Sequence, residues 1–204
     1  MGDDGLITVS EHWPVVKGDY TVGNPASRIA VVTLASNFEA CPSAAIWGSS
    51  KTENLGVEKL IVNIISNSNI RYVLVCGNES RGHLAGHSLL AIHANGIDEQ
   101  GRIIASEGAI PFIENISGKN VERFQRQVTM LDRIGLVDPD EIKKIVDEYR
   151  EVGDPYPEEP VVVCAPRKRQ NLFSVEGAVK GDILISEEFV MDAASGLIYP
   201  AGEF

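Results

Sequence analysis

The order of helix and strand along this chain is set by residues 57–76, which read VEKLIVNIISNSNIRYVLVC. Apolar residues in the first half recur at the spacing of one helical face: Val57, Leu60, Ile61, Ile64 and Ile65. The second half ends in RYVLVC, residues 71–76, a short apolar run that is followed by Gly77. The stretch therefore predicts an amphipathic helix that leads into a buried strand.

The same alternation continues on both sides of this stretch. The predicted strands are residues 28–34, 71–76 and 102–106, and the predicted helices are residues 57–65, 83–94, 118–134 and 139–149. Asn95-Gly96 is typical of a helix end, and Pro139 of a first helical turn. Strands joined through connections of this length favour parallel crossovers. We therefore expect an α/β fold with a Rossmann-like sheet flanked by helices, whose ligand site lies at the carboxyl ends of the strands.

The chain divides into three regions by composition. Residues 1–152 carry the alternating pattern and form the expected main domain. Residues 153–160, GDPYPEEP, hold three prolines and three acidic residues and are interpreted as a linker. Residues 161–204 contain strand-like runs at 161–165, 182–185 and 196–199, which predict a small β-rich C-terminal appendage.

The charge balance is acidic. The 204 residues include 18 Lys and Arg against 29 Asp and Glu, which gives a formal net charge of −11. This excess argues against nucleic acid or an anionic membrane surface as the main partner, because both require clustered cations. Three cysteines without a CxxC pair indicate a reducing compartment. The sequence has no secretory signal pattern and no apolar run of membrane-spanning length, so we expect a cytoplasmic protein.

Residues 77–88, GNESRGHLAGHS, place three glycines, two histidines and a carboxylate between a predicted strand and a predicted helix. An α/β sheet holds its ligands at this position. The positive end of the helix dipole disfavours a protonated imidazole, so His83 is suited to bind a metal as a neutral ligand. The alternative is that His83 is a solvated or capping residue.

The histidines offer a second alternative. His83 and His87 would lie on one helical face and could chelate zinc or nickel, although motif spacing marks no third ligand. His93 and His12 are interpreted as structural or solvent-facing. Cys76 ends a strand and is either buried and inert or accessible and reactive.

Two further segments could contribute to a site. Residues 48–56, GSSKTENLG, could present hydroxyls, backbone N–H groups and Lys51 to an anionic or amide-bearing ligand. The alternative is that Thr52 or Asn54 caps the following helix. Residues 108–115, GAIPFIEN, form either a pocket wall or a core edge strand. The sequence contains no P-loop, no GxGxxG fingerprint and no assignable Ser/His/Asp or Cys/His arrangement.

Five motifs in the same order resemble one known family. They are WPVVKGDY at residues 13–20, KTENLG at 51–56, Gly82-His83, GAIPFIEN at 108–115 and VERFQ at 121–125. Through them, residues 13–150 resemble the A subunit of tetrahydromethanopterin S-methyltransferase, the corrinoid-carrying component of a methanogen membrane complex. Several separate motifs with matching spacing make this resemblance specific.

The resemblance implies a cobamide cofactor, either cobalamin or 5-hydroxybenzimidazolyl cobamide. It implies that His83 is the axial ligand of a cobalt that accepts a methyl group as Co(I) from methyl-tetrahydromethanopterin, or a related donor, and passes it to a thiol such as coenzyme M. A metal-bound histidine has a second hydrogen-bond partner, for which Glu79, Asn78 and the nearby backbone are candidates. The cofactor-binding residues that the family implies are Gly77, Glu79, Gly82, His83, Ser88, Lys51, Thr52, Glu53, Asn54, Leu55, Gly108, Ala109, Ile110 and Pro111.

The sequence departs from the family pattern in three places. Gly48-Ser49-Ser50 stands where members often have Gly-Pro-Cys, His87 stands where Gln is common, and residues 161–204 stand where complex-bound members carry a membrane helix. We therefore expect a soluble homologue whose partners are a corrinoid and other methyltransferase subunits, with no nucleic acid and no membrane span. Homodimer formation stays open. The alternative function is a non-catalytic corrinoid- or nucleotide-binding module that kept the fold.

Overall fold

The computed structural model describes residues 7–163 and the strand residues 183–184, 189–191 and 198–200. The chain divides into two units, Met1–Ala165 and Pro166–Phe204. In the second unit, three short strands form an antiparallel sheet: β6 (Ile183–Leu184), β7 (Phe189–Met191) and β8 (Ile198–Pro200). The strands predicted at 182–185 and 196–199 coincide in part with β6 and β8. Residues 161–163 are not in a strand, and the remaining residues of these predictions lie outside the described part of the chain.

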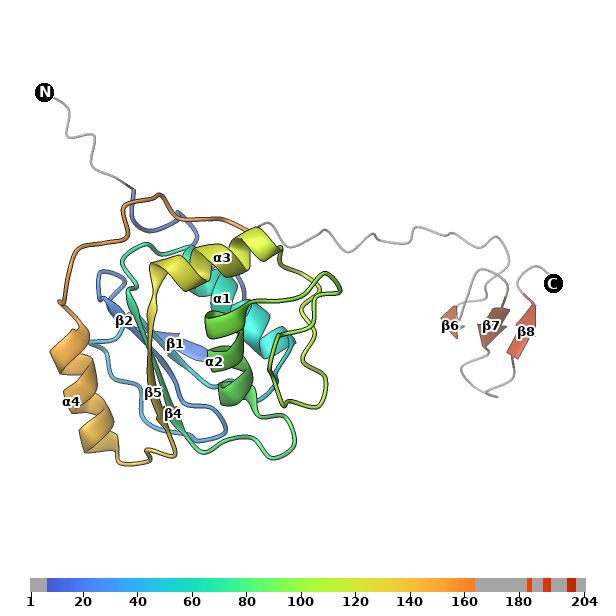
Figure 1. The fold of residues 1–204 in the computed structure, drawn as a ribbon, viewed down its shortest axis with the longest axis horizontal. Coiled ribbons are helices and arrows are strands. Elements are labelled where there is room, and N and C mark those ends of the chain that lie inside the picture. Colours follow the sequence, from blue (N-terminus) through green and yellow to red (C-terminus); the bar gives the residue numbers. More distant parts are fainter. Residues whose placement is uncertain (1–6, 164–182, 185–188, 192–197, 201–204) are drawn as a thin grey trace, which may run out of the picture. The chain divides into compact units, whose positions relative to one another are not determined.

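Five strands form the sheet of the first unit, in the order β1-β3-β2-β4-β5 (Figure 1). Their bounds are Tyr20–Val22 for β1, Ile29–Val32 for β2, Ile46–Gly48 for β3, Tyr72–Gly77 for β4 and Thr129–Ile134 for β5. Strands β3, β2, β4 and β5 run parallel, whereas β1 pairs antiparallel with β3 at the edge. The predicted α/β class is confirmed, and the finer Rossmann-like assignment stays a prediction.

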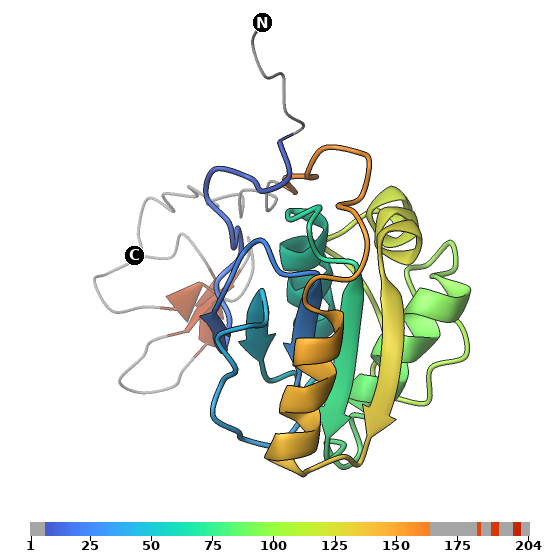
Figure 2. The same ribbon diagram turned by 90° about the vertical axis from the view of Figure 1, so that its left-hand side faces the viewer.

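Helices cover both faces of this sheet (Figure 2). Their bounds are Leu55–Ile65 for α1, Ala85–Asn95 for α2, Gly118–Gln127 for α3 and Pro139–Tyr149 for α4. Strand β4 alternates between two cores: Val73 and Val75 pack with α1, α2 and α3, whereas Leu74 and Cys76 pack with α4. Burial on both faces explains why the strand reads as a continuous apolar run.

The helix predicted at 118–134 is wrong beyond Gln127. Helix α3 begins at a capping box between Ser117 and Asn120, and it ends where Val128 adopts an extended backbone, with φ −119° and ψ 155°. The next six residues pair in register with all of β4. If these residues were helical, the backbone groups on the outer edge of β4 would lack hydrogen-bond partners. A local sequence pattern does not report this pairing between distant strands.

Other strand predictions also need correction. The strand predicted at 102–106 is wrong, because this segment makes only isolated bridges, from Ile103 to Ile97 and from Arg102 to Phe112. Strands β1 and β3, of three residues each, were not predicted, since a run this short shows no clear periodicity.

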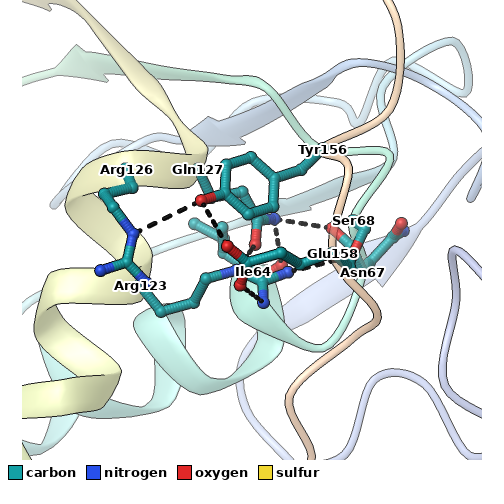
Figure 3. Close-up of polar contacts among 8 residues, drawn as sticks. All are labelled: Ile64, Asn67, Ser68, Arg123, Arg126, Gln127, Tyr156 and Glu158. Carbon is teal, nitrogen blue, oxygen red and sulfur yellow. Dashed lines mark hydrogen bonds and ion pairs between the residues drawn. The ribbon is translucent and has the colours of Figure 1, made fainter.

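Residues 153–160, which the sequence predicts as a linker, pack against α3 and the residues that follow α1 (Figure 3). The Tyr156 ring sits 4.5 Å from the guanidinium carbon of the buried Arg123, and Tyr156 N–H donates to the Ser68 carbonyl at 2.8 Å. Glu158 pairs with Arg123 at 3.3 Å. Burial lowers the pKa of Arg123 and outweighs the opposing effect of Glu158. The segment therefore shields a buried cation at the ends of α1 and α3.

Candidate functional site

The site is built on an imidazole paired with a buried carboxylate. His83 lies in the loop after β4, and Glu53 lies in the loop after β3, so both follow the carboxyl ends of parallel strands. His83 Nδ1 lies 2.8 Å from Glu53 Oε2. The histidine side chain is 53% exposed and the glutamate side chain 1%. The pair thus presents a ring to solvent while its partner stays inside the protein.

Glu53 is held as a carboxylate by its surroundings. Burial raises its pKa, but hydrogen bonds from its own backbone N–H, from Ile110 N–H and from His83 outweigh this effect and hold the pKa below its ordinary value of 4.5. The Ile110 N–H donates to Oε1 at 2.6 Å. An ionised carboxylate only accepts, so His83 Nδ1 carries the proton of this hydrogen bond. Nε2 faces no hydrogen-bond partner among the described residues.

Glu79 and Asn78, the predicted partners of His83, have other contacts. Glu79 accepts the N–H groups of Gly86 at 3.1 Å and His87 at 2.7 Å, so it caps the start of α2. Asn78 N–H donates to Ser36 Oγ at 2.9 Å. The hydrogen-bond partner of His83 in the structure is Glu53, 30 positions away, which proximity in sequence does not indicate.

The alternative of a His83–His87 chelate assumed that both histidines lie on one helix, and His83 lies outside helix α2. Helix α2 begins at Ala85, and Leu84 has a left-handed backbone with φ 47°, so the two imidazoles do not share a helical face. His87 Nδ1 instead lies 3.4 Å from the Glu107 backbone nitrogen. Within the described residues, no three His, Cys, Asp or Glu side chains gather in a group that could hold a metal ion.

The loop that starts at Gly108 closes against the pair. A Cβ atom at Gly108 would lie 2.7 Å from the His83 carbonyl oxygen, 2.9 Å from Glu53 Cγ and 2.9 Å from Ser88 Oγ. The Ser88 hydroxyl is in turn 2.8 Å from the Ser106 hydroxyl. Three of the predicted segments therefore meet here, and the 108–115 segment is a loop rather than a core edge strand.

The remaining predicted residues divide by exposure and role. Leu55 and Ile110, near Glu53 in the sequence and through a hydrogen bond respectively, are 52% and 59% exposed. Asn54 and Thr52 cap α1 by accepting the N–H groups of Leu55 and Gly56, as the capping alternative predicted. Among the other predicted positions, Lys51 and Ala109 are exposed and Pro111 is buried. Gly82 and Gly77 have positive backbone φ angles of 79° and 80°.

The other residues singled out in the sequence are His93, His12 and Cys76. His93 Nε2 lies 2.9 Å from the Val128 carbonyl oxygen, and the ring packs edge-on against Phe124. His12 is exposed. Burial raises the pKa of Cys76 to about 12, so its thiol is inert at neutral pH. The structural interpretation of His93 and the solvent-facing one of His12 are confirmed.

The fold and this site define an α/β protein with an exposed, carboxylate-anchored histidine at the carboxyl edge of its sheet. The family model that describes the A subunit of tetrahydromethanopterin S-methyltransferase matches residues 7–171. The chain belongs to this family, which confirms the resemblance found in the sequence. Within the described residues, no helix is both long and apolar enough to cross a membrane.

Individual relatives agree with this assignment. A protein of Methanosarcina acetivorans, which bears the name of the A subunit of "Putative methyltransferase Mtx", is 74% identical over 191 residues, which cover 94% of this chain and 96% of that protein. The first of two tetrahydromethanopterin S-methyltransferase A subunits of Methanothermobacter thermautotrophicus is 50% identical over 160 residues, which cover 76% of this chain and 67% of that protein.

Proposed function

We propose that this protein is a corrinoid-binding methyl carrier in which His83 Nε2 is the axial ligand of the cobalt. The main support for this proposal is the 2.8 Å contact between His83 Nδ1 and the buried Glu53 carboxylate. A carboxylate on one ring nitrogen sets the tautomer, aims the ring and raises the basicity of the other nitrogen, as in other metal-ligating histidines.

The residues around the pair suit a large cofactor with an apolar face. Leu55 and Ile110 leave apolar surface exposed beside Glu53, and Ala109 adds no bulk. When bound, the corrinoid supplies the cobalt centre that carries a methyl group from donor to acceptor. Glu53 holds the proton on His83 Nδ1, and Gly108 lets the loop lie close to the pair.

The methyl donor proposed is methyl-tetrahydromethanopterin or a related compound, and the acceptor is a thiol such as coenzyme M. Family membership supports the donor class. The relatives' names each describe one component of a methyltransferase with several subunits, which supports separate methyltransferase subunits as partners. The chain itself would act as the carrier between them.

The test is a cobalamin titration followed by visible absorbance, with wild type, His83→Ala and the matched control His12→Ala, whose histidine is exposed. We expect wild type and the control to bind with the same spectral shift, and His83→Ala to lose that shift. Unchanged affinity and spectrum in His83→Ala would overturn the ligand assignment. Binding without methyl transfer when donor, acceptor and partner subunits are supplied would favour the non-catalytic module.

A further inference from the structure

Glu58 is a second buried carboxylate, close in sequence to Glu53 but outside the site described above. It lies in the first turn of α1 and is 3% exposed. Among the described residues, no Lys, Arg or His forms an ion pair with it. A buried charge without a cation is costly unless hydrogen bonds replace the lost water. The partners of Glu58 therefore indicate what this charge is for.

The hydrogen bonds to the Glu58 carboxylate come from two adjacent residues of the loop 108–115. Its Oε1 accepts the backbone N–H groups of Glu114 and Asn115, the second at 3.0 Å. Its Oε2 accepts the side-chain amide of Asn115 at 2.7 Å. Both donor residues are exposed, so the buried carboxylate ties an outward-facing part of the loop to α1. Glu58 thus anchors the end of the loop that leads into α3.

The other end of the same loop is anchored by Glu53. The Ile110 N–H donates to Glu53 Oε1 at 2.6 Å, while Oε2 of the same carboxylate contacts His83. One loop therefore hangs on two carboxylates, which lie five positions apart at the start of α1. The position of Ile110 bears directly on His83, because a single carboxylate joins the two.

The stretch between these anchors is stiffened by its pairing with residues 101–103. The Ile103 N–H donates to the Pro111 carbonyl, and the Ile113 N–H donates to the Gly101 carbonyl, each at 2.8 Å. These bonds pair the two segments with each other and not with a strand of the five-stranded sheet. A single anchor would let this pair of segments tilt relative to α1, whereas two anchors fix its angle.

We propose that Glu58 is a positioning residue of the His83 site. It fixes the angle of the loop 108–115, so that Ile110 meets Glu53 and Glu53 in turn aims the His83 ring. The effect on the ring belongs to the protein alone, whereas the effect on cofactor binding rests on the proposed function.

The test exchanges the two partners of one hydrogen bond. Glu58→Gln keeps an oxygen for the backbone N–H groups but turns an amide NH₂ toward the Asn115 amide, and Glu58→Gln/Asn115→Asp restores that bond in the reverse direction. In a cobalamin titration, we expect Glu58→Gln to bind about tenfold more weakly, as is typical when the support of a metal ligand is lost. The double variant should recover. Gln127→Ala, at the other end of α1, controls for stability: it should unfold more easily in urea and bind cobalamin as wild type does.

A measurement without cofactor separates this inference from the proposed function. Nitrogen NMR of the His83 imidazole, assigned by comparison with His83→Ala, reports which ring nitrogen carries the proton at mildly alkaline pH. We expect the Nδ1–H form in wild type and in the double variant, and a mixture with the Nε2–H form in Glu58→Gln. If wild type binds no cobalamin, the proposed function fails, and this spectrum still decides the role of Glu58. An unchanged spectrum in Glu58→Gln, or an equal loss of cobalamin affinity in Gln127→Ala, would overturn the inference.

Discussion

Glu53 is a charged residue whose side chain is almost completely buried. Its pKa is lowered in the folded state, so the stability it contributes is present above its ordinary pKa of 4.5 and is lost as pH falls through the lower folded value. Glu53→Gln should cost about 1–2 kcal/mol at pH 7, because a neutral amide cannot replace the charge-assisted bonds. Urea unfolding at pH 7 and at successively lower pH measures this. The difference from wild type should shrink toward acid, and a pH-independent difference would contradict the charge argument.

Gly108 is the second residue whose identity the site requires. Gly108→Ala would place a methyl group 2.7 Å from the His83 carbonyl oxygen and 2.9 Å from Glu53 Cγ, so the loop must move away from the pair. We expect a loss of about 1–3 kcal/mol in stability and weaker cobalamin binding. Gly118→Ala is the matched control, because its added Cβ meets nothing within 4 Å at the start of α3. Equal behaviour of the two variants in thermal unfolding and titration would refute the packing argument.

At the scale of elements, Gln127 joins the end of α3 to the end of α1 (Figure 3). Its fully buried amide donates to the carbonyl oxygens of Ile64, Asn67 and Ile70 at 2.9–3.1 Å, and its Oε1 accepts from Arg123. Gln127→Ala would leave these groups unpaired and should destabilise the protein by about 2–4 kcal/mol in urea unfolding. The exposed Gln100 is the control, since Gln100→Ala should change stability by less than about 0.5 kcal/mol. A small effect at Gln127 would mean that water replaces its bonds.

At the scale of the whole molecule, residues 153–163 contact the domain that the sequence predicts to end at residue 152. Tyr156 and Glu158 cover Arg123, and Val161 N–H donates to the Ile65 carbonyl at 2.9 Å. A chain ending at Val152 should be less stable than one ending at Ala165 by about 2–4 kcal/mol, from lost apolar burial and unpaired polar groups. Thermal unfolding of both chains measures this. Identical melting temperatures would instead support the interpretation of residues 153–160 as a linker.

Local patterns predicted much of the fold and the place of His83 in it. The spacing of apolar residues located α1 and α4, and the continuous apolar run located β4, because periodicity and burial are properties of neighbouring residues. The same reasoning placed His83 between β4 and the next helix, at the carboxyl edge of the sheet, although as the first residue of that helix. The family resemblance then brought Glu53 and Gly108 into the set of candidate residues.

Only the tertiary structure determined which of these helices, strands and loops contact one another. Residues 129–134 pair with β4 instead of extending α3, and His83 pairs with Glu53 rather than with the nearer Glu79. In both cases, segments that are distant in sequence form hydrogen bonds with each other's buried polar groups. These pairings therefore depend on the tertiary fold and not on local sequence. The sequence by itself therefore determined the α/β class and placed His83 at the carboxyl edge of the sheet, and the tertiary structure determined which carboxylate anchors this histidine.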